Sequence, residues 1–138
     1  MVFSSIIDRL RKKSQDRREG FPGFPGVSVR EAPVSSDAYA EARIPLFGKP
    51  EIKLSDMSSP GIVRSLGHEI FHVDQKRSNP VRYYLDRFVR KGALVDPIEQ
   101  EAESFGRFYE RLQETSKKRG LAAPPLSIAV TMFKRGSR

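Results

Sequence analysis

Residues 59–75 read SPGIVRSLGHEIFHVDQ and contain the pattern His-Glu-x-x-His. Ser59 is a favourable helix N-cap, and Pro60 suits the first helical position because its missing N–H would have no partner there. On a helix, residues four apart lie on one face, so the imidazoles of His68 and His72 can reach a single metal ion. The stretch therefore predicts a helix that carries two metal-binding side chains.

The opposite side of this helix is apolar. At 100° per residue, His68 and His72 point away from a stripe of aliphatic side chains, so one face is expected to enter a core and the other to remain available, with Glu69 beside the histidines. The chain has only two histidines, and both lie in this pattern. The alternative is that these residues merely decorate a solvated helix face. The aliphatic stripe consists of Ile62, Val63, Leu66, Ile70 and Val73.

The composition indicates one soluble domain. The chain has 138 residues, 38% hydrophobic and 30% charged, and its apolar runs are too short to span a bilayer. It has no cysteine, which excludes disulfides and thiolate metal sites and leaves imidazole and carboxylate as the strong ligands. Structural zinc sites usually use cysteine, so this composition favours a catalytic metal.

The net charge is +8, and the excess lies in local basic runs at 9–18, 87–91, 117–119 and 134–138. Such a balance favours loose association with nucleic acid or anionic surfaces, or with assembly partners through the basic termini, but it equally serves solubility. The first ten residues do not resemble a secretory signal, so we expect a cytoplasmic protein, with a virion component as the alternative.

The order of patterns predicts an α+β fold with a small, mainly antiparallel sheet before the motif helix. Residues 1–19 read as a basic amphipathic helix and 20–26 as a Phe-Pro-Gly linker; 27–120 would form the main domain and 121–138 a C-terminal strand or tail. Strands are expected at Val27–Arg30, Ala38–Leu46 and Glu51–Leu54, and two further helices at 80–92 and 97–118, opened by Asn79-Pro80 and Asp96-Pro97.

A hydrolytic zinc ion needs a third protein ligand and one open position for water. Without another histidine or a cysteine, that ligand must be a carboxylate, and the dense acidic cluster is Glu99, Glu101 and Glu103. Glu99 and Glu103 share one flank of the predicted helix, whereas Glu101 projects on the other side. Asp96 and Glu99 also form a capping box, so spacing places Glu99 only slightly ahead of its neighbours.

The combination of His68-Glu69-x-x-His72 with Glu99-x-x-Ala102-Glu103 resembles the gluzincins, zinc peptidases whose third ligand is a downstream glutamate. The wider pattern, roughly from Ile52 to Leu112, is also similar to small metallopeptidase-like domains of phage and bacterial injection-system proteins. The resemblance implies one zinc ion held by His68, His72 and Glu99, a metallopeptidase activity, and Glu69 as general base.

Two departures from the gluzincin pattern stand out. Glu103 occupies a position where that family often has Asp or Asn, and no further histidine is present to donate a hydrogen bond to the transition state. Tyr83, Tyr84 and Tyr109 are candidates for that donor, and the sequence selects none of them. Asp74 and Glu103 are candidates for orienting the imidazoles.

These expectations describe an enzyme in which Glu69 takes the proton of a zinc-bound water while the strand at 38–46 holds an extended peptide or protein substrate. Two other readings stay open. The chain could be a structural or interaction protein of a virion or other assembly built on a metallopeptidase-like fold. It could also be a zymogen-like form in which the C-terminal strand lies in its own cleft.

Overall fold

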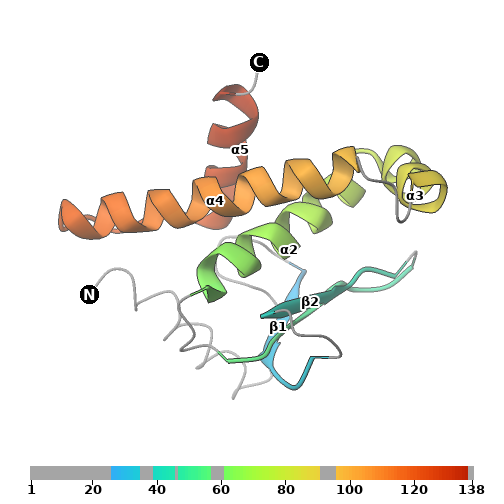
Figure 1. The fold of residues 1–138 in the computed structure, drawn as a ribbon, viewed down its shortest axis with the longest axis horizontal. Helices are drawn as coiled ribbons and strands as arrows, with labels where there is room; N and C mark the ends of the chain where they lie inside the picture. The colour runs from blue at the N-terminus through green and yellow to red at the C-terminus, as the bar shows by residue number, and fades with distance from the viewer. Residues whose placement is uncertain (1–25, 35–38, 46, 57–60, 91–95, 137–138) are drawn as a thin grey trace.

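The computed structural model describes residues 26–34, 39–45, 47–56, 61–90 and 96–136 (Figure 1). These residues form an α+β fold, as predicted, in which helix α2 lies between a small sheet and the long helix α4. The elements are β1 (Ser28–Glu31), β2 (Ala40–Arg43), β3 (Glu51–Leu54), α2 (Ile62–Ser78), α3 (Pro80–Arg90), α4 (Pro97–Lys118) and α5 (Leu126–Gly136). The predicted helix at 1–19 and the linker through residue 25 lie outside the described residues.

The sheet is mixed, with strand order β1-β3-β2, rather than mainly antiparallel. β2 and β3 form the expected antiparallel pair, with Ala42 opposite Ile52, whereas β1 pairs in parallel with β3, with Val29 opposite Ile52. The difference arises because β3 pairs along both edges, and its Ile52 and Leu54 are fully buried. β1 occupies the edge of β3 that the β2–β3 hairpin leaves open, so β2 is an edge strand of this described sheet.

Helix α2 carries the predicted core stripe, since all five of its aliphatic positions are buried. The helix begins at Ile62 with Gly61 as N-cap, two residues later than Ser59-Pro60 predicts, and residues 57–60 lie outside the described residues. α2 and α4 cross at two glycines: a Cβ atom on Gly106 would lie 2.6 Å from the Arg64 carbonyl oxygen, and one on Gly67 would lie 3.3 Å from the Gly106 Cα. The glycines therefore permit a close crossing of the two helices.

The next two helices begin where the sequence predicts. The Asn79 side chain accepts a hydrogen bond from the Arg82 N–H (3.1 Å), and Asp96 accepts from the N–H groups of Ile98 and Glu99 (3.0 and 3.3 Å), which satisfies donors left free at a helix start. In α4, apolar residues at helical spacing are buried in the core, namely Ile98, Ala102, Phe105 and Tyr109. In α3, by contrast, three large apolar side chains are exposed, namely Val81, Leu85 and Phe88.

The predicted C-terminal strand is wrong, because Leu126–Gly136 forms helix α5. Leu126, Ile128, Val130 and Met132 alternate with smaller or polar residues, a pattern that favours a strand. The same segment also has apolar residues at helical spacing, and a short segment fits both periods. Leu126, Ala129 and Val130 are buried, and the Phe133 ring packs 5.4 Å from Phe71 and 5.5 Å from Phe105, measured between ring centroids. α5 therefore completes the core of the same unit and does not occupy a cleft as a strand.

None of the described helices combines the length and the apolar composition needed to cross a lipid bilayer.

Candidate metal centre

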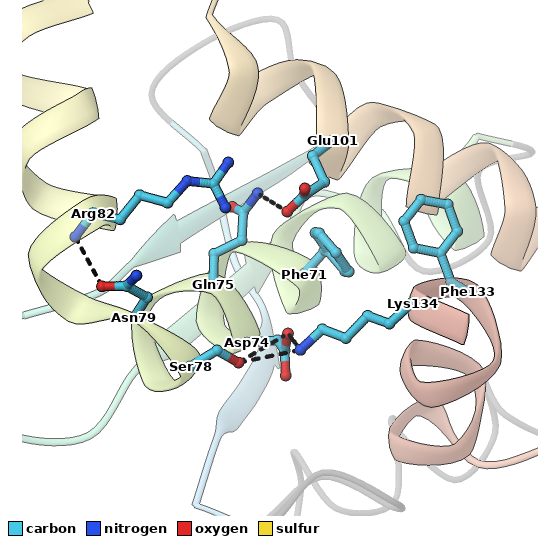
Figure 2. A pocket seen from close by; sticks show the side chains of 9 residues that line it. All are labelled: Phe71, Asp74, Gln75, Ser78, Asn79, Arg82, Glu101, Phe133 and Lys134. Carbon is cyan, nitrogen blue, oxygen red and sulfur yellow. Dashed lines mark hydrogen bonds and ion pairs between the residues drawn. The ribbon is translucent and has the colours of Figure 1, made fainter. Parts of the chain in front are cut away.

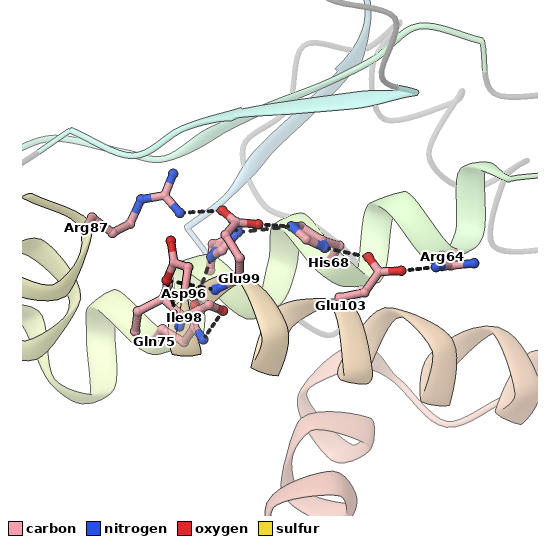
Figure 3. Close-up of polar contacts among 9 residues, drawn as sticks. Arg64, His68, Gln75, Arg87, Asp96, Ile98, Glu99 and Glu103 are labelled. Carbon is pink, nitrogen blue, oxygen red and sulfur yellow. Dashed lines mark hydrogen bonds and ion pairs between the residues drawn. The ribbon is translucent and has the colours of Figure 1, made fainter. Parts of the chain in front are cut away.

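The side chains of His68, His72 and Glu99 converge between α2 and α4. Figure 3 shows the Glu99 carboxylate of α4 facing His68 of α2. The two Nε2 atoms lie 3.1 Å apart, and the Glu99 carboxylate places one oxygen 2.9 Å from His68 Nε2 and the other 3.1 Å from His72 Nε2. Adjacent ligands in a tetrahedral zinc site with bonds of about 2.0–2.1 Å are about 3.3 Å apart. The three side chains are therefore close enough to hold one metal ion.

The outer nitrogens of both imidazole rings have hydrogen-bond acceptors. His68 Nδ1 lies 3.1 Å from Glu103 Oε2, and His72 Nδ1 lies 2.8 Å from Gln75 Oε1. A carboxylate and an amide oxygen only accept, so both Nδ1 atoms carry the protons. In neutral rings this leaves the lone pairs on the two Nε2 atoms, which is the arrangement of histidines that bind metal through Nε2.

These contacts show that the donor set fits a cation. Two Nε2 lone pairs and a carboxylate that meet within about 3 Å repel one another unless a positive charge lies between them. The close contacts of Glu99 with His68 and then with His72 hold the pKa of its carboxyl well below its usual range.

Of the predicted capping box, the structure shows the half in which the Asp96 side chain accepts the hydrogen bond. The Glu99 backbone N–H contributes to the helix cap through Asp96, whereas its carboxylate turns toward the histidines. A further contact was missed from the sequence: Arg87 Nη1 of α3 lies 2.5 Å from Glu99 Oε1. Its position twelve residues before Glu99 gave no signal, since only the folding of α3 against α4 brings the two groups together.

The other acidic candidates lie around the cluster of His68, His72 and Glu99 and not within it. Glu103 contacts His68 Nδ1 and forms ion pairs with Arg64 and Arg107, so it holds the position expected of an orienting residue. Glu101 accepts a hydrogen bond from the Gln75 side chain (3.1 Å). The spacing correctly placed Glu101 on a different flank of α4 from Glu99.

The expectation that Asp74 orients an imidazole is wrong. Its carboxylate faces α5, where it pairs with Lys134 Nζ at 2.5 Å and with the Ser78 hydroxyl. The next residue, Gln75, makes the contact with His72 instead. Gln75 lies three positions after His72 on the same helix, a spacing that brings side chains together and that could have identified it from the sequence.

Glu69 is partly buried beside the cluster. Desolvation by burial raises the pKa of its carboxyl above the ordinary value, although the nearby histidines oppose this effect. Together with His68 it lines a cavity of about 370 Å³ that extends to Tyr39 and Ala40 at the start of β2. The cavity therefore joins the candidate metal centre to the edge strand.

The structure separates the three tyrosine candidates. The Tyr109 hydroxyl lies in the core, where it accepts a hydrogen bond from Gln113 at 2.9 Å, and the Tyr84 hydroxyl faces the Ile44 carbonyl oxygen at 3.4 Å. Tyr83 packs against His72, with ring centroids 6.2 Å apart. Burial raises the pKa of Tyr83, so its hydroxyl keeps its proton at neutral pH. Of the three, Tyr83 is the one beside the cluster.

Comparisons of the chain with protein-family models, with curated proteins and with solved structures found no match.

Proposed function

We propose that the chain is a zinc-dependent metallopeptidase of the gluzincin type. The observation that carries this proposal is the convergence of two Nε2 atoms and one carboxylate, with each Nδ1 atom engaged by an acceptor. Two imidazoles and one carboxylate form a ligand set typical of catalytic zinc, which leaves a fourth position for water or substrate.

In this proposal Glu69 is the general base. Bound zinc would supply a Lewis acid that acidifies water and polarises the scissile carbonyl. Glu69 would take the proton of the attacking water and pass it to the leaving amine. The raised pKa of Glu69 supports this role, because it brings the carboxylate closer to the neutral range in which a base can both accept and return a proton.

The proposed substrate is an extended peptide or protein segment. β2 is an edge strand of the described sheet, and its first residue, Ala40, lines the same cavity as His68 and Glu69, together with the preceding Tyr39. A strand edge presents unpaired backbone groups that can bind a peptide by β-augmentation. We therefore expect backbone pairing along β2 to place a peptide bond next to Glu69, with the Tyr83 hydroxyl as candidate donor to the developing oxyanion.

The first experiment is the metal content of protein purified without chelators. We expect one zinc per wild-type chain and loss of zinc in His72→Ala and in Glu99→Ala, whereas Glu114→Ala, at an exposed acidic position of the same helix α4, retains it as the matched control. Glu69→Gln should keep zinc and lose peptide hydrolysis. A wild-type chain that binds no metal after zinc is supplied would overturn the proposal, and an active Glu69→Gln variant would remove Glu69 from the mechanism.

A second candidate function is that of an assembly protein built on the same fold. It is favoured by the exposed apolar side of α3, where Val81, Leu85 and Phe88 are 74%, 57% and 85% exposed. Exposed apolar patches often mark protein contacts. Under this reading, Leu85→Glu with Phe88→Glu abolishes self-association or partner binding and leaves zinc content unchanged. Sedimentation analysis of the zinc-loaded chain distinguishes the two readings.

A further inference from the structure

Gln75 lies in the last turn of α2 and is 6% exposed. All of its side-chain polar atoms have contacts: Oε1 lies 2.8 Å from His72 Nδ1, and Nε2 donates to the Ile98 carbonyl oxygen at 3.0 Å and to Glu101 Oε1 at 3.1 Å. Figure 2 shows the Gln75 amide reaching across to Glu101, with Phe71 and Asp74 on other sides of the same pocket.

These contacts fix the orientation of the amide. The two groups on one side, a backbone carbonyl and a carboxylate, are acceptors, so only the NH₂ group of Gln75 can face them. A flipped amide would place three oxygens together in a buried site, which is costly. Oε1 must therefore face His72, and His72 Nδ1 must be the donor.

We propose that Gln75 is a positioning residue that holds His72 in the Nδ1–H tautomer and thereby directs the Nε2 lone pair toward the metal. It also connects the two ligand-bearing helices, because Ile98 and Glu101 lie on either side of Glu99 in the first turns of α4. The Gln75 amide thus fixes the ring orientation of the α2 ligand His72 relative to the part of α4 that carries the ligand Glu99.

A neutral amide suits this position. His72 is 3% exposed, the adjacent cluster already contains the Glu99 carboxylate, and the partly buried Glu69 lies beside it. A carboxylate at position 75 would add a further negative charge close to Glu101, whereas an amide supplies an acceptor to His72 and two donors to α4 without net charge. The metal-affinity part of this inference rests on the proposed function; the tautomer part concerns the metal-free protein alone.

The test compares Gln75→Met, which keeps the side-chain length and removes both polar functions, with Gln75→Glu, which keeps an acceptor for His72. Gln113→Met is the matched control, since Gln113 is a buried glutamine on α4 whose amide contacts Tyr109 and not the cluster. Nitrogen NMR of the imidazole rings reports the tautomer in metal-free protein, and competition with a chelator reports zinc affinity.

We expect His72 of the wild type to be protonated at Nδ1 in the metal-free protein at mildly alkaline pH. Gln75→Met should give a mixture of tautomers and lower zinc affinity by about 10- to 100-fold. Gln75→Glu should restore the Nδ1–H tautomer and part of the affinity, and Gln113→Met should leave both at the wild-type level. If Gln75 had a purely structural role, Gln75→Glu and Gln75→Met would not differ in the His72 tautomer or in zinc affinity.

Two results would overturn the inference: an Nε2–H tautomer in the wild type, which needs no variant to fold, or unchanged tautomer and affinity in Gln75→Met. If neither the wild type nor any of the variants binds zinc, the metallopeptidase proposal fails. The tautomer comparison still decides the role of Gln75 in that case.

Discussion

His68 and His72 face the same point but lie in different surroundings. The His68 side chain is 18% exposed, borders the cavity that leads to β2, and pairs its outer nitrogen with Glu103, which two arginines also contact. The His72 side chain is 4% exposed and pairs with a buried neutral amide. The His68 end of the cluster is thus open and charged, whereas the His72 end is closed and held by packing. Removing each residue should therefore affect different properties.

The largest expected effect is a difference in unfolding free energy between two variants of the metal-free chain, His72→Ala and His68→Ala. His72→Ala should lower the free energy of unfolding by about 3 kcal/mol, because it leaves a buried cavity and an unpaired Gln75 oxygen. His68→Ala should cost less than about 1 kcal/mol, since water can replace the ring. Urea unfolding in the presence of chelator measures both, although both variants should lose metal. Equal costs would contradict the distinction between an open and a closed end.

A second prediction concerns the close crossing of α2 and α4, which brings the two histidines next to Glu99. In Gly106→Ala the new Cβ would lie 2.6 Å from the Arg64 carbonyl oxygen, so the helices must separate. We expect a loss of about 2 kcal/mol in unfolding free energy and weaker zinc binding, because His68 moves away from Glu99. Gly136→Ala, where nothing lies within 4 Å of the new atom, is the control and should be neutral or slightly stabilising. Wild-type affinity in Gly106→Ala would show that α2 and α4 can shift without disturbing the ligands.

The smallest expected effect concerns Glu69, the partly buried carboxylate at the open end. Its pKa is raised by burial from an ordinary value of 4.5. Below that pH it is protonated in both folded and unfolded chains and does not affect stability. As pH rises further, the unfolded chain ionises first, so the wild type loses stability until the raised folded pKa is passed.

Glu69→Gln removes this loss. We expect the variant to match the wild type at pH 4 and to be more stable at pH 7, as measured by urea unfolding with chelator present. A stability difference that is constant across this range would show that Glu69 does not retain its proton on folding.

Long periodic segments were predictable from the sequence. The core stripes of α2 and α4 each cover several turns, and proline after a capping residue marks the starts of α3 and α4, so local chemistry identified these helices. Glu99 was favoured as a candidate ligand because its pattern with His68 and His72 resembles that of the gluzincins. The structure places it beside His68 and His72, which spacing alone did not require.

The remaining features depend on contacts between distant segments. Arg87 meets Glu99 only because α3 folds back on α4, and Gly106 matters only because Arg64 lies against it. The eleven residues of α5 fit both the strand and the helix period, and the position of Phe133 among the aromatic side chains of α2 and α4 favours the helix. Neither periodicity nor propensity contains that information.

The placement of candidate ligands on two helices has a consequence for the lifetime of the protein. An ion held by His68, His72 and Glu99 would fasten α2 to α4 and bind the folded chain in preference to the unfolded one. At a free concentration one hundred times its dissociation constant, such an ion stabilises the folded state by about 2.7 kcal/mol. Newly made chains that lack the ion would unfold more often and be degraded sooner, so the cellular abundance of this protein would follow the supply of metal.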